Sequence, residues 1–581
     1  MITFRNSTAC SSTMMPAVYS SCLNRLISCN SLQLASRIQR SHHLLSDGYP
    51  ACFAAQRTRL RGSIKDVPRT SIAKFKRHIL EQKHYQSKLL MFSTTSMLLN
   101  REVPLTSEQY PSLKRGKFGS VEADDVSFFE SILPGRVVTE RDELEGANTD
   151  WLRICRGQSK LLLKPKTTEE VSKILQYCYK RSLAVVPQGG NTGLVGGSVP
   201  VFDEIVISTA LMNEIMDFNQ LSGTLTCQAG CILENLDQFV QNQGYTMPLD
   251  LGAKGSCHIG GNVATNAGGI RLLRYGSLHG NVLGVEAVLA NGEVFNGLTT
   301  LRKDNTGYDL KQLFIGSEGT LGVITAVSLL CPPKPQSVNL AFLGCKDFGA
   351  VLDTLKFAKT KLGEVLSAFE VLDHECMKLQ VTYGNHKNPL VGPPHGFYVV
   401  VETSGSNEDH DQQKMTSFLE EAMEKSLVED GTLATDSVKF QTLWHLREGI
   451  AESLMRAGVV YKYDFSFAVE DFYDLVEVMR TRLRGEALLV CGYGHVGDGN
   501  LHLNIVGPTL SKEFLALIEP FVFDWTASKG GSVSAEHGLG FKKRNAMGFS
   551  KSDKQIEIMQ EMKRLFDPKC ILNPYKTIPG V

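Results

Sequence analysis

The sequence lacks a long apolar segment and an excess of either charge. No uninterrupted hydrophobic run in its 581 residues approaches the roughly 20 residues that a membrane-spanning helix needs. Its 61 lysines and arginines are balanced by 61 acidic residues, which gives no electrostatic reason to expect nucleic-acid binding. A chain of this length with 42% hydrophobic residues can form more than one domain. We therefore expect a folded protein that binds neither a membrane nor nucleic acid.

Two familiar sequence motifs are also missing. The 14 cysteines include no Cys-x-x-Cys pair, so we expect reduced, mostly buried thiols and no metal framework built from cysteine. No Gly-x4-Gly-Lys-[Ser/Thr] loop for a nucleoside triphosphate occurs. One Gly-x-Gly-x-x-Gly occurs at 492–497, but the following residues 501–506 alternate like a strand, whereas a Rossmann fingerprint needs a helix there. A nicotinamide site is therefore not predicted.

Acidic residues are almost absent from the N-terminal segment. Residues 1–100 hold 14 lysines and arginines and only 3 acids, a formal charge of +11, and the first acid is Asp47. A segment rich in arginine and serine and poor in acids is typical of an organelle transit peptide. A disordered basic tail is the alternative interpretation. We predict that residues 1–100 are a mitochondrial presequence or extension and that the mature protein lies in the matrix.

Hydrophobic periodicity predicts alternating helices and strands in two successive regions. Before residue 330 we predict helices at 168–179 and 232–243 and strands at 183–187, 204–208, 224–229 and 283–289. Pro332, Pro333 and Pro335 then interrupt the pattern and indicate a boundary. Beyond it we predict strands at 341–343, 396–402, 459–467, 465–469 and 501–506, and helices at 347–361, 408–427, 442–457 and 553–566. The expected segments are 101–155, 156–335, 336–560 and 561–581.

Two glycine-rich stretches point to an anionic ligand. Residues 187–199 contain five glycines and residues 250–269 contain six, each accompanied by serine, threonine and asparagine. Glycine lets the backbone approach a ligand closely, and consecutive N–H groups in such loops suit a pyrophosphate. Ordinary turns are the alternative interpretation, but two such dense clusters make a dinucleotide site the better one.

These stretches, together with Ile315-Gly-Ser-Glu-Gly-Thr-Leu-Gly-Val-Ile324, resemble the flavin domain of the vanillyl-alcohol-oxidase family. The resemblance implies an α+β fold: a two-subdomain PCMH-type FAD-binding domain at 156–335, an α/β substrate (cap) domain at 336–560, and a C-terminal segment that returns to the flavin domain. It also implies FAD contacts from Gly189, Gly190, Asn191, Thr192, Gly193, Ser198, Ser256, Gly260, Gly261, Asn262, Thr265, Asn266, Ile324 and Asn573.

The resemblance also bears on how FAD is held. Some members of the family bind FAD covalently through a histidine of the first loop. Asn191 occupies the corresponding place here, so we expect non-covalent FAD. His258 is the nearest candidate for another linkage, although a loop histidine is more often an ordinary polar residue.

A second group of polar residues lies near the C-terminus. On the predicted strand 501–506, His502 and Asn504 share one face, while His495 precedes it and Glu536 and His537 lie in another glycine-rich loop. Two histidines and one glutamate leave a coordination position open, as in catalytic zinc sites. Each histidine alone would more often be an ordinary polar residue. Together they predict a metal site.

The sequence around these residues resembles that of the flavin-linked D-2-hydroxyacid dehydrogenases, and this resemblance covers about 120–581. It implies that His495, His502 and Glu536 bind a divalent metal, with zinc as the expected ion. We further hypothesise that His537 is the catalytic base that removes the hydroxyl proton. A soluble electron acceptor is expected, which in related mitochondrial enzymes is electron-transfer flavoprotein. The oligomeric state is left open, a homodimer being one option.

Arg447 and Lys462 are the residues from which we predict the substrate. They are similar to the pair that grips the distal carboxylate of D-2-hydroxyglutarate in some members, and a guanidinium and an ammonium suit a carboxylate. With Asn504 and His537 they form the expected substrate site, for oxidation to 2-oxoglutarate. Ala451 replaces a threonine of some relatives. A D-lactate dehydrogenase of the same family, or an alkylglycerone-phosphate synthase-like flavin transferase, are the alternatives.

Overall fold

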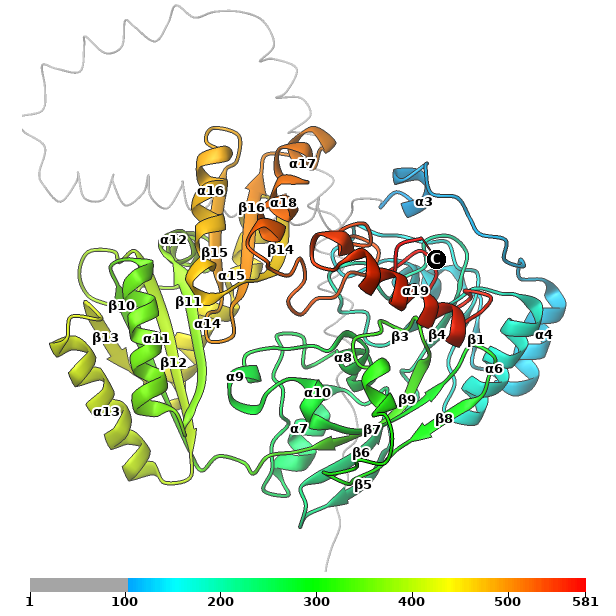
Figure 1. The fold of residues 1–581 in the computed structure, drawn as a ribbon, viewed down its shortest axis with the longest axis horizontal. Helices are drawn as coiled ribbons and strands as arrows, with labels where there is room; N and C mark the ends of the chain where they lie inside the picture. Colours follow the sequence, from blue (N-terminus) through cyan, green and yellow to red (C-terminus); the bar gives the residue numbers. More distant parts are fainter. Residues whose placement is uncertain (1–102, 581) are drawn as a thin grey trace, which may run out of the picture. The chain divides into compact units, whose positions relative to one another are not determined.

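The computed structural model describes residues 103–580 of the chain. The presequence predicted at 1–100 therefore lies outside the described residues. Three β-sheets with helices packed on them make up the described part, so the predicted α+β class is confirmed (Figure 1). None of the helices in residues 103–580 combines the length and the apolar character needed to cross a membrane.

The first half of the described chain contains two sheets. A four-stranded sheet has the order β1-β2-β4-β3, and its strands are Val137–Val138, Leu162–Leu163, Ile205–Ser208 and Val185–Gln188. A five-stranded antiparallel sheet has the order β5-β6-β9-β7-β8, with strands Ile215–Asn219, Thr224–Gln228, Val323–Leu330, Val282–Val288 and Val294–Gly297. The predicted strands in this half are present, with bounds shifted by one or two residues.

Helices of this half pack against both sheets (Figure 1). They are α3 (Thr106–Gln109), α4 (Ala123–Ile132), α5 (Arg141–Asn148), α6 (Thr168–Arg181), α7 (Leu233–Gln241), α8 (Ile259–Thr265), α9 (Leu272–Tyr275), α10 (Leu278–Asn281) and the 3-10 helix η2 (Leu310–Leu313). The side chain of Thr167 accepts from the N–H of Glu170 and begins α6, whose apolar face packs on the four-stranded sheet. Each of the two sheets has its own apolar core.

The second half is built on a seven-stranded sheet with the order β13-β10-β12-β11-β15-β16-β14. Its strands are Asp430–Leu433, Ser337–Cys345, Phe397–Gly405, Leu366–Asp373, Leu489–His495, Asn500–Gly507 and Val459–Ser466. Every neighbouring pair in it is antiparallel. Because β14 ends at Ser466 and residues 469–471 form a 3-10 turn, the strand predicted at 465–469 is wrong.

Helices cover both faces of this sheet. They are α11 (Phe348–Leu362), α12 (His374–Thr382), α13 (Glu408–Glu424), α14 (Ser437–Glu448), α15 (Ile450–Ala457), α16 (Asp474–Arg482), α17 (Lys512–Ile518), α18 (Phe521–Ser528), and the 3-10 helices η3 (Val469–Asp471) and η4 (Met547–Phe549). The helices α11, α13, α16, α17 and α18 pack on one face, and α12, α14 and α15 pack on part of the other. The single helix predicted at 442–457 is two helices that meet at Gly449.

The C-terminal segment returns to the first half of the fold. Helix α19 (Asp553–Phe566) is followed by Leu572, which pairs in parallel with Val185 at the edge of β3. The buried ammonium of Lys563 donates to the carbonyls of Thr320 and Leu572 and to Asp567. The boundary expected at residue 560 falls inside α19, because this helix is continuous across it.

Candidate functional site

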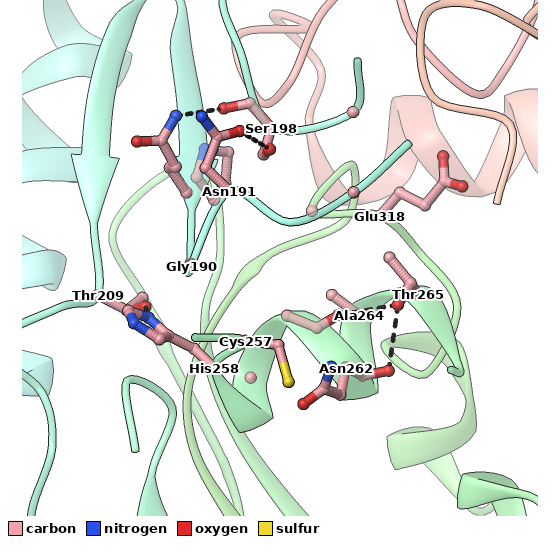
Figure 2. A pocket seen from close by; sticks show the side chains of 18 of the residues that line it. Gly190, Asn191, Ser198, Thr209, Cys257, His258, Asn262, Ala264, Thr265 and Glu318 are labelled. Carbon is pink, nitrogen blue, oxygen red and sulfur yellow. Dashed lines mark hydrogen bonds between the residues drawn. The ribbon is translucent and has the colours of Figure 1, made fainter. Parts of the chain in front are cut away.

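A cavity in the first half is lined by both glycine-rich stretches. Its empty space is about 930 Å³, including open solvent at its mouth. The predicted FAD residues that line it are Gly189, Gly190, Asn191, Thr192, Gly193, Ser198, Gly260, Gly261, Asn262, Thr265 and Ile324. Figure 2 shows the loop with Gly190 and Asn191 facing helix α8, from which Asn262 and Thr265 project.

Close backbone packing explains why glycine is needed at the first loop. A Cβ atom on Gly190 would lie 2.0 Å from the carbonyl oxygen of Ser256, so the two glycine-rich stretches touch there through their backbones. At Gly193 and Gly261, by contrast, a Cβ atom would meet no protein atom within 4 Å. These two glycines therefore leave cavity space open that a side chain would occupy.

The donors and acceptors around the cavity suit a bound dinucleotide. The side-chain oxygen of Asn262 is buried without a hydrogen-bond partner, and such an atom calls for a ligand or water. Three of the predicted FAD residues do not line the cavity: Ser256, Asn266 and Asn573. Asn573 instead donates to the carbonyls of Gly197 and Glu318, at 3.0 and 2.7 Å, and holds the C-terminal segment against the cavity wall. The residues present fit FAD.

The side chain of Asn191 is occupied by protein contacts. It donates to the carbonyls of Gly146 and Thr149 and accepts from the hydroxyl of Ser198 at 2.8 Å. His258 lines the cavity, contacts Thr209 through Nδ1 at 3.2 Å, and has its pKa lowered by burial. An amide is not a nucleophile, so the expectation of non-covalent FAD rests on Asn191.

The second cluster lies on one face of the seven-stranded sheet. Cross-strand register places Glu370, His495 and Asn500 in one row, and Tyr493, His502 and Asp464 in the next. Asn504 and Lys462 are opposite each other in a third row. The intervening residues Leu501, Leu503 and Ile505 belong to the apolar core, which confirms the predicted division of this strand into a polar and an apolar face.

Three histidines converge on one carboxylate oxygen. The Nε2 atoms of His495, His502 and His537 lie 4.0, 3.8 and 3.4 Å from Oε1 of Glu536. Burial would raise the pKa of Glu536, but the histidines lower it well below its usual value. Burial and the neighbouring His495 lower the pKa of His502, which favours the neutral imidazole that binds metals. The arrangement suits a divalent cation.

Two acids that the sequence analysis missed complete the cluster. Asp464, His502, Glu536 and His537 have potential ligand atoms that all lie within 4.8 Å of one another. Asp464 also accepts from the side chain of Asn500 at 2.8 Å and from the N–H groups of Glu536 and His537, both at 3.0 Å. The polar residues of β14 alternate with buried tyrosines and Phe465, and this period of two is the signal that could have identified Asp464.

Glu370 is the other missed acid. It is buried in β11, accepts from Nδ1 of His495 at 2.6 Å and from Nε of Arg447 at 2.8 Å. Burial opposes its charge, yet His495 and Arg447 hold its pKa at about 2, while Glu370 raises that of His495 to about 9 against the effect of burial. A carboxylate on the second ring nitrogen orients a metal-binding histidine. Glu370 therefore aims Nε2 of His495 at Glu536.

The residues expected to hold substrate lie beside this cluster. Arg447 is buried on α14 with its guanidinium 4.6 Å from the ring centre of Tyr493, and its terminal amino groups have no hydrogen bond within residues 103–580. Asn504 has a buried side-chain oxygen without a partner. The Lys462 ammonium is free of hydrogen bonds and ion pairs to described residues, and burial and Lys542 lower its pKa to about 8. These groups remain available to an anion.

Glu318 connects the flavin cavity with the loop that carries Glu536 and His537. It lines the cavity in a left-handed conformation, with φ of 52°. Its carboxylate accepts from the N–H groups of Leu539 and Gly540, at 2.6 and 2.9 Å, and from the hydroxyl of Thr577. The loop is also held by the N–H of Gly269, which donates to Glu536 at 2.8 Å.

Replacing Glu318 by alanine should loosen this loop. We expect Glu318→Ala to lower the free energy of unfolding by about 2 kcal/mol, because two N–H groups lose a charged acceptor. Denaturant unfolding of the purified protein measures the change. Glu318→Gln, which keeps one acceptor oxygen, should lose less than half as much. Equal stability of the alanine variant and the unchanged protein would contradict this role.

Comparison with known proteins agrees with the geometry. Residues 159–297 match the family model "FAD binding domain", and residues 334–577 match "FAD linked oxidases, C-terminal domain". The rat protein named mitochondrial D-2-hydroxyglutarate dehydrogenase is 60% identical over 479 residues, which cover 82% of this chain and 89% of the rat protein. A Saccharomyces cerevisiae protein named D-2-hydroxyglutarate–pyruvate transhydrogenase is 46% identical over 82% of this chain and 98% of its own length.

The fold is also found in solved structures. An alkyldihydroxyacetonephosphate synthase aligns with a TM-score of 0.61 and 17% identity, over 80% of this chain and 86% of that one. Fold and site thus define a flavin-linked oxidoreductase of the FAD-linked oxidase class. Within that class, the chain belongs to the family of FAD-dependent D-2-hydroxyglutarate dehydrogenases.

Proposed function

We propose that the protein oxidises D-2-hydroxyglutarate to 2-oxoglutarate in the mitochondrial matrix, with non-covalent FAD and a divalent metal, zinc being the expected ion. One observation carries the proposal: His537 lines the flavin cavity, and its Nε2 atom lies 3.4 Å from Oε1 of Glu536, one of the proposed metal ligands. A substrate carbon can therefore lie beside both the flavin and the metal. The names of the curated relatives supply the substrate and the compartment.

The side chains divide the chemistry among them. FAD held in the cavity would supply an acceptor for the hydride of C2, and a cation held by His495, His502 and Glu536 would supply Lewis acidity toward the substrate hydroxyl. His537 takes up the hydroxyl proton at Nε2. Asp464 fixes this base, because its carboxylate lies 3.6 Å from Nδ1 of His537 and holds the backbone N–H of the same residue. Loss of one hydride and one proton converts the alcohol to the ketone.

Positive side chains hold the dianionic substrate. Arg447 keeps Nε on Glu370 and offers its remaining amino groups, while Lys462 offers an ammonium from β14. Asn504, opposite Lys462 in the sheet, supplies an amide beside Lys462. Ala451 has no hydroxyl, unlike the threonine of some relatives, so substrate binding should depend on the charged groups.

Reduced FAD must pass its electrons to an acceptor. We propose electron-transfer flavoprotein, a soluble acceptor that suits a matrix enzyme. A 2-oxo acid such as pyruvate is the second candidate, favoured by the name of the yeast relative. Anaerobic reoxidation of the reduced enzyme by each acceptor in turn distinguishes the two.

Anaerobic flavin reduction with a panel of D-2-hydroxy acids tests the proposed function. We expect D-2-hydroxyglutarate to bleach the flavin at least about tenfold more efficiently than D-lactate, because only the former has a second carboxylate for the cationic side chains. EDTA treatment should abolish the bleaching, and added zinc should restore it. Preferred reduction by D-lactate would favour the rival dehydrogenase. Absence of bleaching by every acid would favour a transferase without net redox change.

A further inference from the structure

The segment 269–274, which contains α9, connects the flavin cavity with the half of the fold that is built on the seven-stranded sheet. It begins where the second glycine-rich stretch ends. Its apolar side chains, Ile270 and Leu273, pack on the apolar cores of the seven-stranded sheet. The guanidinium of Arg274 donates to the carbonyl of Glu364, just before β11. A segment that continues the wall of the flavin cavity is therefore held by the other half.

Arg271 forms an ion pair inside this contact. Its guanidinium donates to Glu402 of β12, whose side chain is fully buried, while the side chain of Arg271 is 22% exposed. It also lies 3.9 Å from a carboxylate oxygen of Asp250, in the second glycine-rich stretch. Burial opposes the charge of Arg271, but Glu402 and Asp250 raise its pKa above the ordinary value. Because a buried carboxylate without its cation is strongly disfavoured, this pair holds the two halves in one arrangement.

Glu402 carries the contact on to the strand and the helix that bear site residues. Its carboxylate accepts from the indole Nε1 of Trp444 at 2.9 Å and from the hydroxyl of Ser367 at 2.7 Å. Trp444 lies one turn before Arg447 on α14. Ser367 lies in β11, the strand that also contains Glu370. One carboxylate thus joins both of these elements to the flavin half of the fold.

We propose that Arg271 is a positioning residue, which through Glu402 sets the distance between the flavin and the substrate carbon that loses the hydride. The inference rests on the proposed function, in which FAD is held by one half of the fold and the metal by the other. Reacting atoms need to lie about 3–3.5 Å apart, and a misplacement of about 1 Å can lower a rate about 100-fold. Arg271 neither lines the flavin cavity nor belongs to the metal-type cluster, so it acts through the contact between the halves.

Arg271→Met tests this role in the flavin-loaded enzyme. At saturating D-2-hydroxyglutarate, the limiting rate of anaerobic flavin reduction should fall by about 10- to 100-fold, while the dissociation constant of the substrate changes by less than about threefold. A second measurement needs no turnover. Titration of the oxidised enzyme with 2-oxoglutarate should give a near-normal affinity by calorimetry but a weaker change in the flavin absorption spectrum, because the ligand lies farther from the flavin.

Arg274→Met is the matched control. Arg274 carries the same charge on the same segment, but it contacts a backbone carbonyl and not a buried carboxylate. Its rate of flavin reduction and its spectral change with 2-oxoglutarate should equal those of the unchanged protein. Equal losses in Arg271→Met and Arg274→Met would contradict a specific role of the ion pair.

The double variant Arg271→Met/Glu402→Gln separates positioning from stability. Arg271→Met alone leaves a buried charge unpaired and should lower the melting temperature. Glu402→Gln removes that charge and keeps an acceptor for Trp444 and Ser367. We expect the double variant to regain the melting temperature but not the rate.

Two results would overturn the inference: a normal rate in Arg271→Met, or a rate that recovers together with the melting temperature in the double variant. Failure of D-2-hydroxyglutarate to reduce the unchanged enzyme would overturn the proposed function instead. The same variants are then compared with the acid of the panel that does reduce the flavin, and the two results above decide on Arg271 as before.

Discussion

His502→Ala should abolish both metal binding and flavin reduction by D-2-hydroxyglutarate. His502 belongs to the metal set expected from the sequence and also to the cluster of Asp464, His502, Glu536 and His537 that the structure brings together. Loss of one of three protein ligands should leave the purified variant with little metal and reduce its rate of flavin reduction about a thousandfold or more. Elemental analysis and anaerobic stopped-flow spectroscopy measure the two effects.

A matched control and a second pair of variants sharpen this test. His445→Ala, at an exposed histidine of α14, should retain full metal content. His537→Ala should retain the metal and lose proton transfer, because His537 is the proposed base. Loss of the metal from this variant would instead identify His537 as a ligand. His495→Ala should lose the metal, because His495 is a proposed ligand. Full metal content in His502→Ala would refute the site.

Gly190→Ala should yield a protein that folds but does not hold flavin. The added Cβ would lie 2.0 Å from the carbonyl oxygen of Ser256, a backbone atom that cannot move aside without moving the second glycine-rich stretch. Strain of about 3 kcal/mol or more between two walls of the cavity corresponds to a loss of FAD affinity of about 100-fold or more. Flavin absorbance per polypeptide, followed by titration of the apoprotein with FAD, gives the number.

Gly146→Ala is the control for this effect. Gly146 is exposed in α5, and a Cβ atom there would meet no protein atom within 4 Å. Its flavin content should equal that of the unchanged protein. Normal flavin content in Gly190→Ala would show that the two stretches can separate without loss of the cofactor, and that the close approach is not required for binding.

Local patterns were sufficient to predict most of the fold. Helix α19 was predicted with its observed bounds, Asp553–Phe566, because serine and aspartate precede a clear apolar periodicity. The helix at 442–457 was predicted as one, since a glycine within a helical pattern does not reveal whether the chain changes direction there. Gly449 does so, and Arg447 thereby lies at the end of α14.

The site was only partly predictable from sequence, for a different reason. The histidines and Glu536 lie in or beside glycine-rich segments that resemble a known family, whereas Glu370 lies in a buried strand without such a signal. The role of Glu370 arises from its contact with His495, more than a hundred residues away in the sequence. Strand pairing creates these contacts, and a single sequence does not reveal which strands become neighbours.

The hydrogen bond from the N–H of Gly269 to Glu536 connects the proposed FAD site with the proposed metal site. The two ligands are coupled through it without contact between them. Gly269 ends the second glycine-rich stretch of the flavin domain, and Glu536 belongs to the proposed metal set. If FAD orders that stretch, the position of Glu536 and hence the affinity of the site for the metal change as well. Coupling between two binding equilibria is reciprocal, so the factor by which FAD tightens the metal is the factor by which the metal tightens FAD. Chelation should therefore make the flavin easier to dialyse away, and removal of flavin should make the metal easier to chelate.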